Sequence, residues 1–284
     1  ETRLENIGRM RNKGIELSLD GLVLQRPEMN VSAGFVFSHD KNEVVDLGGK
    51  GFIPTAQASG QGQSNQFTQR IMPGQPLGTF WGPEFVGFDA GGHQLFNSYT
   101  INADGSRTID GQVQAKDLTS DDDVILGNAF PDYSLGLRTN GNWKKFDFSL
   151  LINRVSGGKI FNNTRLVYEQ KGNALQDKNF LEAALTDPSE IHEPAKYSSR
   201  YIEDGSYTRL QNITVGWTFD LPSFTGTARN SRVFLSADNL ALWTNYSGYD
   251  PEVHTQLPGL APRGIDYLHY PRGRTFTGGL RVAF

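Results

Sequence analysis

The sequence predicts an all-β fold, a segment of an antiparallel transmembrane β-barrel, and three observations carry this prediction. About seven segments alternate apolar and polar residues at period two, which is typical of strands with two different faces. Short turns and long loops alternate between these segments. No run approaches ~18 apolar residues, so the sequence contains no candidate transmembrane helix.

The first two predicted strands are joined by a short Pro-containing turn at 25–28. The first covers residues 13–24, and the second begins at Met29 and alternates Phe35 and Phe37 with small or polar residues. After Asp40 the alternation lapses until about residue 130, although 103–112 is predicted to form a turn between short strands. Before about residue 130, periodicity therefore predicts only these two long strands.

Alternation returns at 132–138 and 146–153, with Asn140-Gly141-Asn142 predicted as the hairpin turn between them. Residues 174–185 could form a short helix. The next strand covers 207–220, where Leu210 is out of phase and predicts a β-bulge. The last two strands begin near Val233 and Arg274.

The order of the connections points to a membrane. The turns at 25–28, 140–144 and 221–230 fall at one end of the strands, and the loops at 40–130, 156–205 and 240–273 fall at the other. Outer-membrane barrels have short periplasmic turns and long extracellular loops. We therefore expect the apolar faces to meet lipid and the polar faces to meet a wet lumen. Pattern alone leaves open a large secreted β-protein with an ordinary core.

The count of seven strands also predicts that the chain is part of a barrel and not a complete barrel. Bacterial single-chain barrels have an even number of strands from eight upward. The chain opens at Glu1 with no signal peptide, and we expect a mature or truncated chain whose beginning is missing.

Composition excludes several functional classes. A net charge of −4 gives no electrostatic case for nucleic acid, and the absence of Cys removes disulfides and thiolate metal sites. The five His residues are scattered, without the motifs of metalloproteases or serine hydrolases. Gly157-Gly158-Lys159 lacks the rest of a phosphate-binding loop. We therefore predict that the chain is not an enzyme.

Aromatic residues in the long loops are the candidate ligand-binding residues, because sugar rings and peptide side chains stack on flat apolar faces. The alternative for each is loop packing or the aromatic girdle of a barrel. The candidates are Trp81, Phe85, Trp243, Tyr246 and Tyr249.

Two acidic clusters are candidate Ca²⁺ sites in the outer loops, because carboxylates are hard oxygen ligands. The first contains Asp117, Asp121, Asp122 and Asp123, and the second contains Asn102, Asp104 and Asp110. Neither has the full spacing of a calcium loop, so a solvated acidic loop and an Asp-Gly turn are the favoured alternatives.

Seven blocks of sequence, taken in order, resemble the C-terminal barrel of SusC/RagA-type TonB-linked outer-membrane proteins of Bacteroidetes. The blocks are NKGIELSL (12–19), QPLGTFWGPEFVGF (75–88), ILGNAFPDYSLGL (125–137), KFDFSLLINRVSGGKIFN (145–162), RYIEDGSYTRLQNITVGWTF (200–219), ADNLALWTNYSGYDPEV (237–253) and YPRGRTFTGGLRVAF (270–284). A single block is weak evidence, but seven in this order are specific.

This resemblance implies a nutrient importer in the outer membrane of a Gram-negative bacterium. Such a barrel has about 22 strands, an N-terminal plug, a TonB connection and a SusD-like surface lipoprotein that covers it. Residues 1–284 would be the C-terminal part of that barrel, with the plug and the remaining barrel absent. Phe284 occupies the position of the family's barrel-assembly signal.

Two other functions stay open. The chain could belong to a barrel that serves as a scaffold or docking subunit of a surface complex, or to a soluble β-rich enzyme or adhesin. The loop composition does not separate oligosaccharide from peptide as the cargo.

Overall fold

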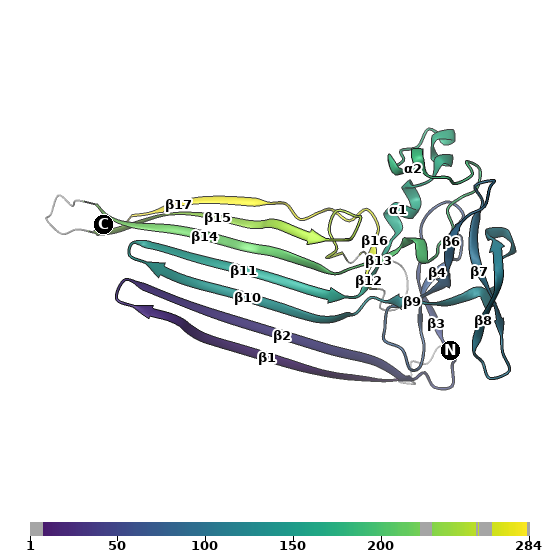
Figure 1. Cartoon of the computed structure of the whole chain (residues 1–284), viewed down its shortest axis with the longest axis horizontal. Helices are drawn as coiled ribbons and strands as arrows, with labels where there is room; N and C mark the ends of the chain where they lie inside the picture. Colours follow the sequence, from purple (N-terminus) through teal and green to yellow (C-terminus); the bar gives the residue numbers. More distant parts are fainter. Residues whose placement is uncertain (1–7, 222–228, 254, 256–262, 283–284) are drawn as a thin grey trace, which may run out of the picture.

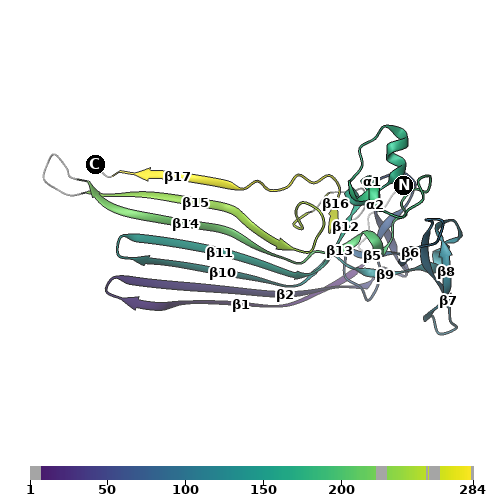
Figure 2. The same cartoon turned by 45° about the horizontal axis from the view of Figure 1, so that its top comes forward.

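A seven-stranded antiparallel sheet forms one long body, and the remaining elements gather at one end of it (Figures 1 and 2). The computed structural model describes residues 8–221, 229–253, 255 and 263–282. The sheet contains, in spatial order, β1 (Arg9–Arg26), β2 (Met29–Asp46), β10 (Pro131–Trp143), β11 (Phe146–Gly157), β14 (Tyr207–Leu221), β15 (Arg229–Thr244) and β17 (Thr275–Arg281).

The long strands follow one another up and down in chain order, which confirms the predicted count of seven and the antiparallel arrangement. Two-residue turns join β1 to β2 and β10 to β11 at the end remote from the loops, whereas the long connections leave the opposite end (Figure 1). In the described part of the chain, β1 and β17 each pair with a strand on one side only. Within the described residues the sheet is therefore open at both edges.

The predicted turn at residues 140–142 is wrong, because these residues belong to β10 and pair with β11. Gly141 lies opposite Phe148, and a Cβ built on Gly141 would be 2.6 Å from the Phe148 ring. A glycine is needed there for the close approach of that ring, not for a turn. The turn follows three residues later, where Lys144 takes the left-handed conformation with φ 52°.

The predicted bulge at Leu210 is confirmed. The register of β14 shifts between Leu210 and Asn212 against both of its neighbours, β11 and β15. On β15 the facing irregular residue is Asn239, whose φ is 53°. Beyond the extra residue of the bulge, the side chains of β14 again alternate between the two faces of the sheet.

Two ion pairs cross the polar face of the sheet and skip one strand each. Arg138 on β10 donates to Asp20 on β1 over Gly34 of β2, at 2.5 Å. A Cβ on Gly34 would lie 2.2 Å from the Asp20 carboxylate and 2.4 Å from Arg138 Nε. Glycine on the intervening strand therefore makes room for the pair.

The second pair repeats this arrangement three strands further along the sheet. Arg232 on β15 donates to Asp147 on β11 at 2.5 Å, over Gly216 of β14. A Cβ on Gly216 would lie 2.4 Å from the Arg232 guanidinium. Long charged side chains thus lie flat on this face, which requires polar surroundings.

The loop region contains three small sheets. They comprise β3 (Ile53–Gln57), β4 (Phe67–Ile71), β5 (Thr79–Pro83) and β9 (Asp123–Asn128); β6 (Phe85–Phe88), β7 (Gln94–Ile101) and β8 (Arg107–Gln114); and β12 (Lys159–Asn162), β13 (Ile202–Asp204) and β16 (Ile265–Asp266). The turn predicted within 103–112 is confirmed between β7 and β8.

The helices of the loop region are short. They are α1 (Asn163–Tyr168), α2 (Ala183–Thr186) and the 3-10 helices η1 (Ala115–Asp117), η2 (Ser120–Asp122), η3 (Lys171–Gln176) and η4 (Ser199–Tyr201). The helix predicted at 174–185 is wrong as one element, because only its two ends are helical. Asp177, with φ 52°, ends η3. Among the described residues no helix is long and apolar enough to span a membrane.

The loop region has its own core, to which the sheet of β3, β4, β5 and β9 and the sheet of β12, β13 and β16 both contribute residues. Phe80, Phe161, Tyr197 and Ile265 are fully buried in it. The Tyr197 hydroxyl donates to the Thr68 carbonyl at 2.7 Å, so this buried polar atom is satisfied. The core fixes the loops on the rim of the sheet.

Candidate functional site

One face of the long sheet is apolar across all seven strands. Strand register places its side chains in line from β1 to β17, at Ile15, Leu17, Leu19, Phe35, Phe37, Leu135, Leu137, Phe148, Leu150, Ile152, Ile213, Val215, Leu235, Phe276 and Leu280. Many remain open to the surroundings, and Leu235 and Phe276 are 70% and 72% exposed. An apolar face of this extent needs an apolar medium or partner against it.

Aromatic rings border this apolar face at both ends of the strands. Trp143, Phe146, Trp217 and Phe219 lie near the turns, and Phe37, Tyr133 and Trp243 lie near the loops. On β10, Tyr133 and Trp143 stand ten residues apart, which is roughly 33 Å along the strand, or about 25 Å across a bilayer at a tilt of about 40°. This is the height of the apolar band of an outer-membrane barrel.

The opposite face is polar and hydrogen-bonded. Asn212 donates to Asp238 at 2.7 Å, and the hydroxyls of Thr214 and Ser236 lie 2.8 Å apart. With the two ion pairs that cross it, this face suits water and not lipid.

A buried ion-pair network ties the loops to the sheet just above the bulge. Arg209 on β14 is 1% exposed and donates to Asp250 at 2.6 Å and to Asn239. Glu252 lies 3.5 Å from Arg209 and accepts from Arg272 at 2.8 Å. Four distant stretches of the sequence are thus held at one point.

A second network holds the loops to one another. Arg200 contacts Glu169 at 2.6 Å and also pairs with Asp187, and all three side chains are at most 10% exposed. Burial opposes the charge of Arg200, but Tyr201, Glu169 and Asp187 outweigh it and raise the pKa of the guanidinium. Burial also raises the pKa of Tyr201 to about 12. These groups are structural, because each has its partner within the chain.

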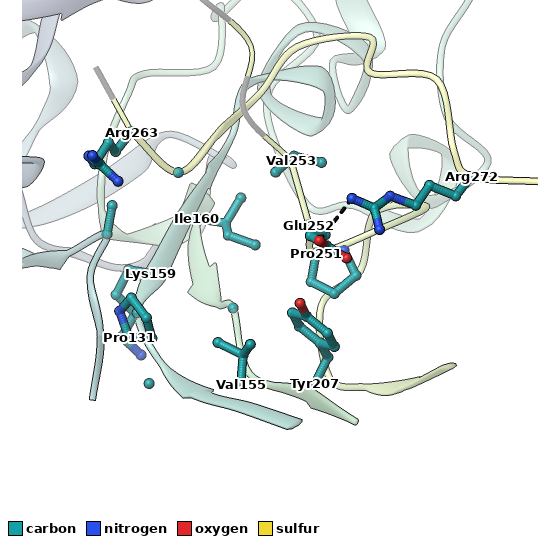
Figure 3. Close-up of a pocket in the computed structure, with 15 residues that line it drawn as sticks. Pro131, Val155, Lys159, Ile160, Tyr207, Pro251, Glu252, Val253, Arg263 and Arg272 are labelled. Carbon is teal, nitrogen blue, oxygen red and sulfur yellow. Dashed lines mark hydrogen bonds and ion pairs between the residues drawn. The ribbon is translucent and has the colours of Figure 1, made fainter. Parts of the chain in front are cut away.

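A pocket of about 460 Å³ opens between the rim of the sheet and these loops (Figure 3). Its apolar walls are Pro131, Val155, Ile160, Pro251 and Val253, and Tyr207 lies at its base in the view. The charged groups of its lining are Lys159 and Arg263 on one side and the Glu252–Arg272 pair on the other. Sequence reasoning missed this site because its residues come from six separate stretches of the sequence, which no single periodic pattern connects.

The structure separates the five predicted ligand-binding aromatics instead of bringing them together. The guanidinium of Arg70 lies 4.4 Å from the centre of Trp81 and that of Arg107 lies 5.3 Å away. Phe85 packs on Phe88 and Phe96. These two rings stabilise the loop region, and their ligand-binding role stays a prediction.

The other three aromatics have three different surroundings. Tyr246 is buried and donates to Asp266 at 2.6 Å, and burial together with Asp266 raises its pKa. Trp243 lies on the apolar face and is 58% exposed, as the girdle interpretation expects. Tyr249 is 79% exposed on a loop. Trp243 and Tyr249 both keep an exposed ring, and Tyr249 is the one on a loop, where a ligand could stack on it.

Two of the four aspartates of the first acidic cluster have roles within the fold. Asp122 caps η2 by accepting from the backbone and hydroxyl of Thr119, and Asp123 lies 3.7 Å from Arg70. Burial raises the pKa of Asp123 in spite of this arginine. Asp117 and Asp121 are exposed. Among the described residues no group of three or more His, Cys, Asp or Glu could hold a metal ion, and the Ca²⁺ site stays a prediction.

The second cluster is a turn between β7 and β8. Asp104 accepts from the backbone and hydroxyl of Ser106, and Asp110 accepts from Thr100. Phe284 lies outside the described residues, so its role in barrel assembly also stays a prediction.

No protein-family model matches the chain, but individual proteins do. It is 31% identical to TonB-dependent receptor P3 of Formosa agariphila over 301 residues, and 25% identical to TonB-dependent receptor SusC of Bacteroides thetaiotaomicron over 293 residues. These alignments cover 100% and 99% of this chain but 30% and 27% of the relatives. The chain thus spans about 30% of the length of the curated relatives it matches.

Solved structures show the same fold. The RagAB peptide transporter superposes with a TM-score of 0.76 at 23% identity, over 99% of this chain and 30% of that chain. The RagAB peptide importer in its closed-closed state gives a TM-score of 0.75. The chain therefore has the fold of one part of the barrel of a TonB-dependent receptor. It corresponds to the C-terminal barrel portion of a SusC/RagA-type outer-membrane protein, as the seven sequence blocks predicted.

Proposed function

We propose that the chain forms part of the wall and outer loops of an outer-membrane importer of nutrient oligomers. The observation that carries this proposal is the apolar face that continues over seven strands between two aromatic borders, backed by a polar face. A sheet with these two faces separates lipid from a water-filled lumen. The names of the relatives, which are TonB-dependent receptors and a peptide transporter, support import as the task.

The same proposal includes parts that lie outside residues 1–284. The remaining barrel and a plug would complete the pore, TonB would supply energy through a segment outside this chain, and a SusD-like lipoprotein would cover the loop end. Residues 1–284 then form one part of one barrel domain, with the loops at 40–130, 156–205 and 240–273 outside the cell.

Uptake tests the function directly. A strain that lacks the gene is expected to lose growth on one class of oligosaccharide or peptide and to regain it with the complete gene, but not when TonB is deleted. Growth that is unchanged without the gene, combined with loss of a surface complex, would instead favour the scaffold function.

Thiol labelling tests the orientation, because the chain contains no Cys. Lys144→Cys sits in the β10–β11 turn and Asp104→Cys in the β7–β8 turn, at opposite ends of the sheet. In intact cells we expect a membrane-impermeant maleimide to label Asp104→Cys and to leave Lys144→Cys unlabelled until the cells are lysed. The parent protein is the control, and labelling of Lys144→Cys in intact cells would contradict the orientation.

A further inference from the structure

The pocket of about 460 Å³ between the sheet and the loops, here named the rim pocket, opens on the polar side of the sheet. Val155 pairs with Tyr207, and it stands three residues beyond Ile152, which belongs to the apolar face. Side chains three residues apart in a strand point to opposite faces. Both wall residues therefore point to the polar side, which the proposed function assigns to the lumen.

Local backbone geometry holds two of the pocket's cations together. Residues 264–266 run parallel to β12, with Phe161 pairing with Ile265 and its amide donating to the Gly264 carbonyl at 2.8 Å. Gly264 approaches so closely that a Cβ built on it would be 2.6 Å from the Lys159 carbonyl oxygen. Arg263 and Lys159 consequently border the same side of the pocket (Figure 3).

These two cations have no anionic partner among the described residues. The Arg263 guanidinium lies 4.8 Å from the centre of the Phe130 ring, and the stem of Lys159 packs over Gly127. Across the pocket, Arg272 is neutralised by Glu252, which Arg209 also approaches. The lining thus carries an excess of positive charge, although the chain as a whole has a net charge of −4.

The walls increase the effect of this charge. Pro131, Val155, Ile160 and Val253 contribute apolar surface, which lowers the local dielectric and strengthens attraction between an anion and a nearby cation. A pocket of about 460 Å³ also has the size of a small-molecule site.

We propose that the rim pocket is a subsite that binds a carboxylate group of the imported oligomer through Lys159 and Arg263, with the Glu252–Arg272 pair as its opposite wall. This inference rests on the proposed function for its cargo. A carboxylate can be supplied by a peptide C-terminus or by a uronic acid, and the two sources share the chemistry that the pocket recognises.

Binding to the purified complete protein in detergent tests the site without requiring transport. The probes for calorimetry are acetyl-tetraalanine with a free C-terminal carboxylate, the same peptide as its C-terminal amide, and trigalacturonate. We expect at least one carboxylate probe to bind, and Lys159→Gln combined with Arg263→Gln to weaken that binding about tenfold or more, as the loss of charged hydrogen bonds implies. Binding should also weaken as salt is raised.

Lys50→Gln is the matched control, because Lys50 lies on an exposed turn away from the pocket, and it should leave affinity unchanged. Gel mobility with and without heating shows that the double variant is folded. Preference for the peptide acid over its amide identifies a peptide source, and preference for trigalacturonate identifies a uronic acid. Equal binding by parent and double variant, or no binding of either carboxylate probe, overturns the subsite and leaves the uptake experiment to judge the proposed function.

Discussion

Replacing Leu137 with arginine in the complete protein is expected to lower the free energy of unfolding in lipid vesicles by about 2–4 kcal/mol, the cost of an arginine on the lipid face of a barrel near the bilayer midplane. Leu137 lies on the apolar face within β10, opposite Phe35 and Ile152, and is 41% exposed. A guanidinium there would lose its water with no anion beside it. Urea titration followed by tryptophan fluorescence measures the change.

Val36 supplies the matched control, because it is also apolar and 49% exposed but lies on the polar face, opposite Ser18 and Gly136. Val36→Arg should change the free energy of unfolding by less than about 1 kcal/mol, as surface substitutions do. If the two variants lose equal stability, the assignment of lipid and lumen to the two faces is wrong. A larger loss for Val36→Arg would reverse the assignment.

The long strands could be predicted from the sequence because their evidence is local. Each needs only alternation at period two, and Leu210 showed its bulge by breaking that alternation. The turn at 140–142 was placed wrongly because an Asn-Gly pair occurs both in hairpin turns and within strands. In a strand the glycine can make room for an aromatic ring on the neighbouring strand. Only the pairing of Gly141 with Phe148 distinguishes these two uses.

The loop region could not be predicted in the same way. Its strands, such as β3 and β12, have two to eight residues, which is too short for periodicity to separate them from loops. The aromatics illustrate the limit for the site: Tyr246 and Tyr249 are three residues apart, yet one is buried against Asp266 and the other is exposed. Tertiary packing decides this difference, and residue type does not.

The buried ion-pair network of Arg209 could not be predicted from the sequence for a related reason. Arg209 lies in a strand where an arginine fits a wet face, so nothing in the sequence marks it as fully buried. Its partners, Asn239 and Asp250, lie 30 and 41 residues away, and both belong to the block ADNLALWTNYSGYDPEV (237–253). The resemblance singles out this block without a physical reason, and the structure supplies one: the block completes the junction between sheet and loops.

Replacing Arg209 with glutamine in the complete protein is expected to lower the free energy of unfolding by about 3–5 kcal/mol, because it leaves the buried carboxylate of Asp250 without its partner. Arg138→Gln is the matched control, since Arg138 and Asp20 are 59% and 52% exposed and such a pair contributes about 1 kcal/mol or less. Urea titration in vesicles measures both.

The combination of Arg209→Gln with Asp250→Asn tests the reason for this loss. Removing both charges takes away the unpaired carboxylate, so the double variant should be more stable than Arg209→Gln alone. Limited proteolysis should show the same order, with the loop region released fastest in Arg209→Gln, because Arg209 holds residues 250–252 to β14. If Arg209→Gln and Arg138→Gln lose equal stability, the junction does not depend on the buried charge pair and the apolar loop core alone holds the loops on the sheet.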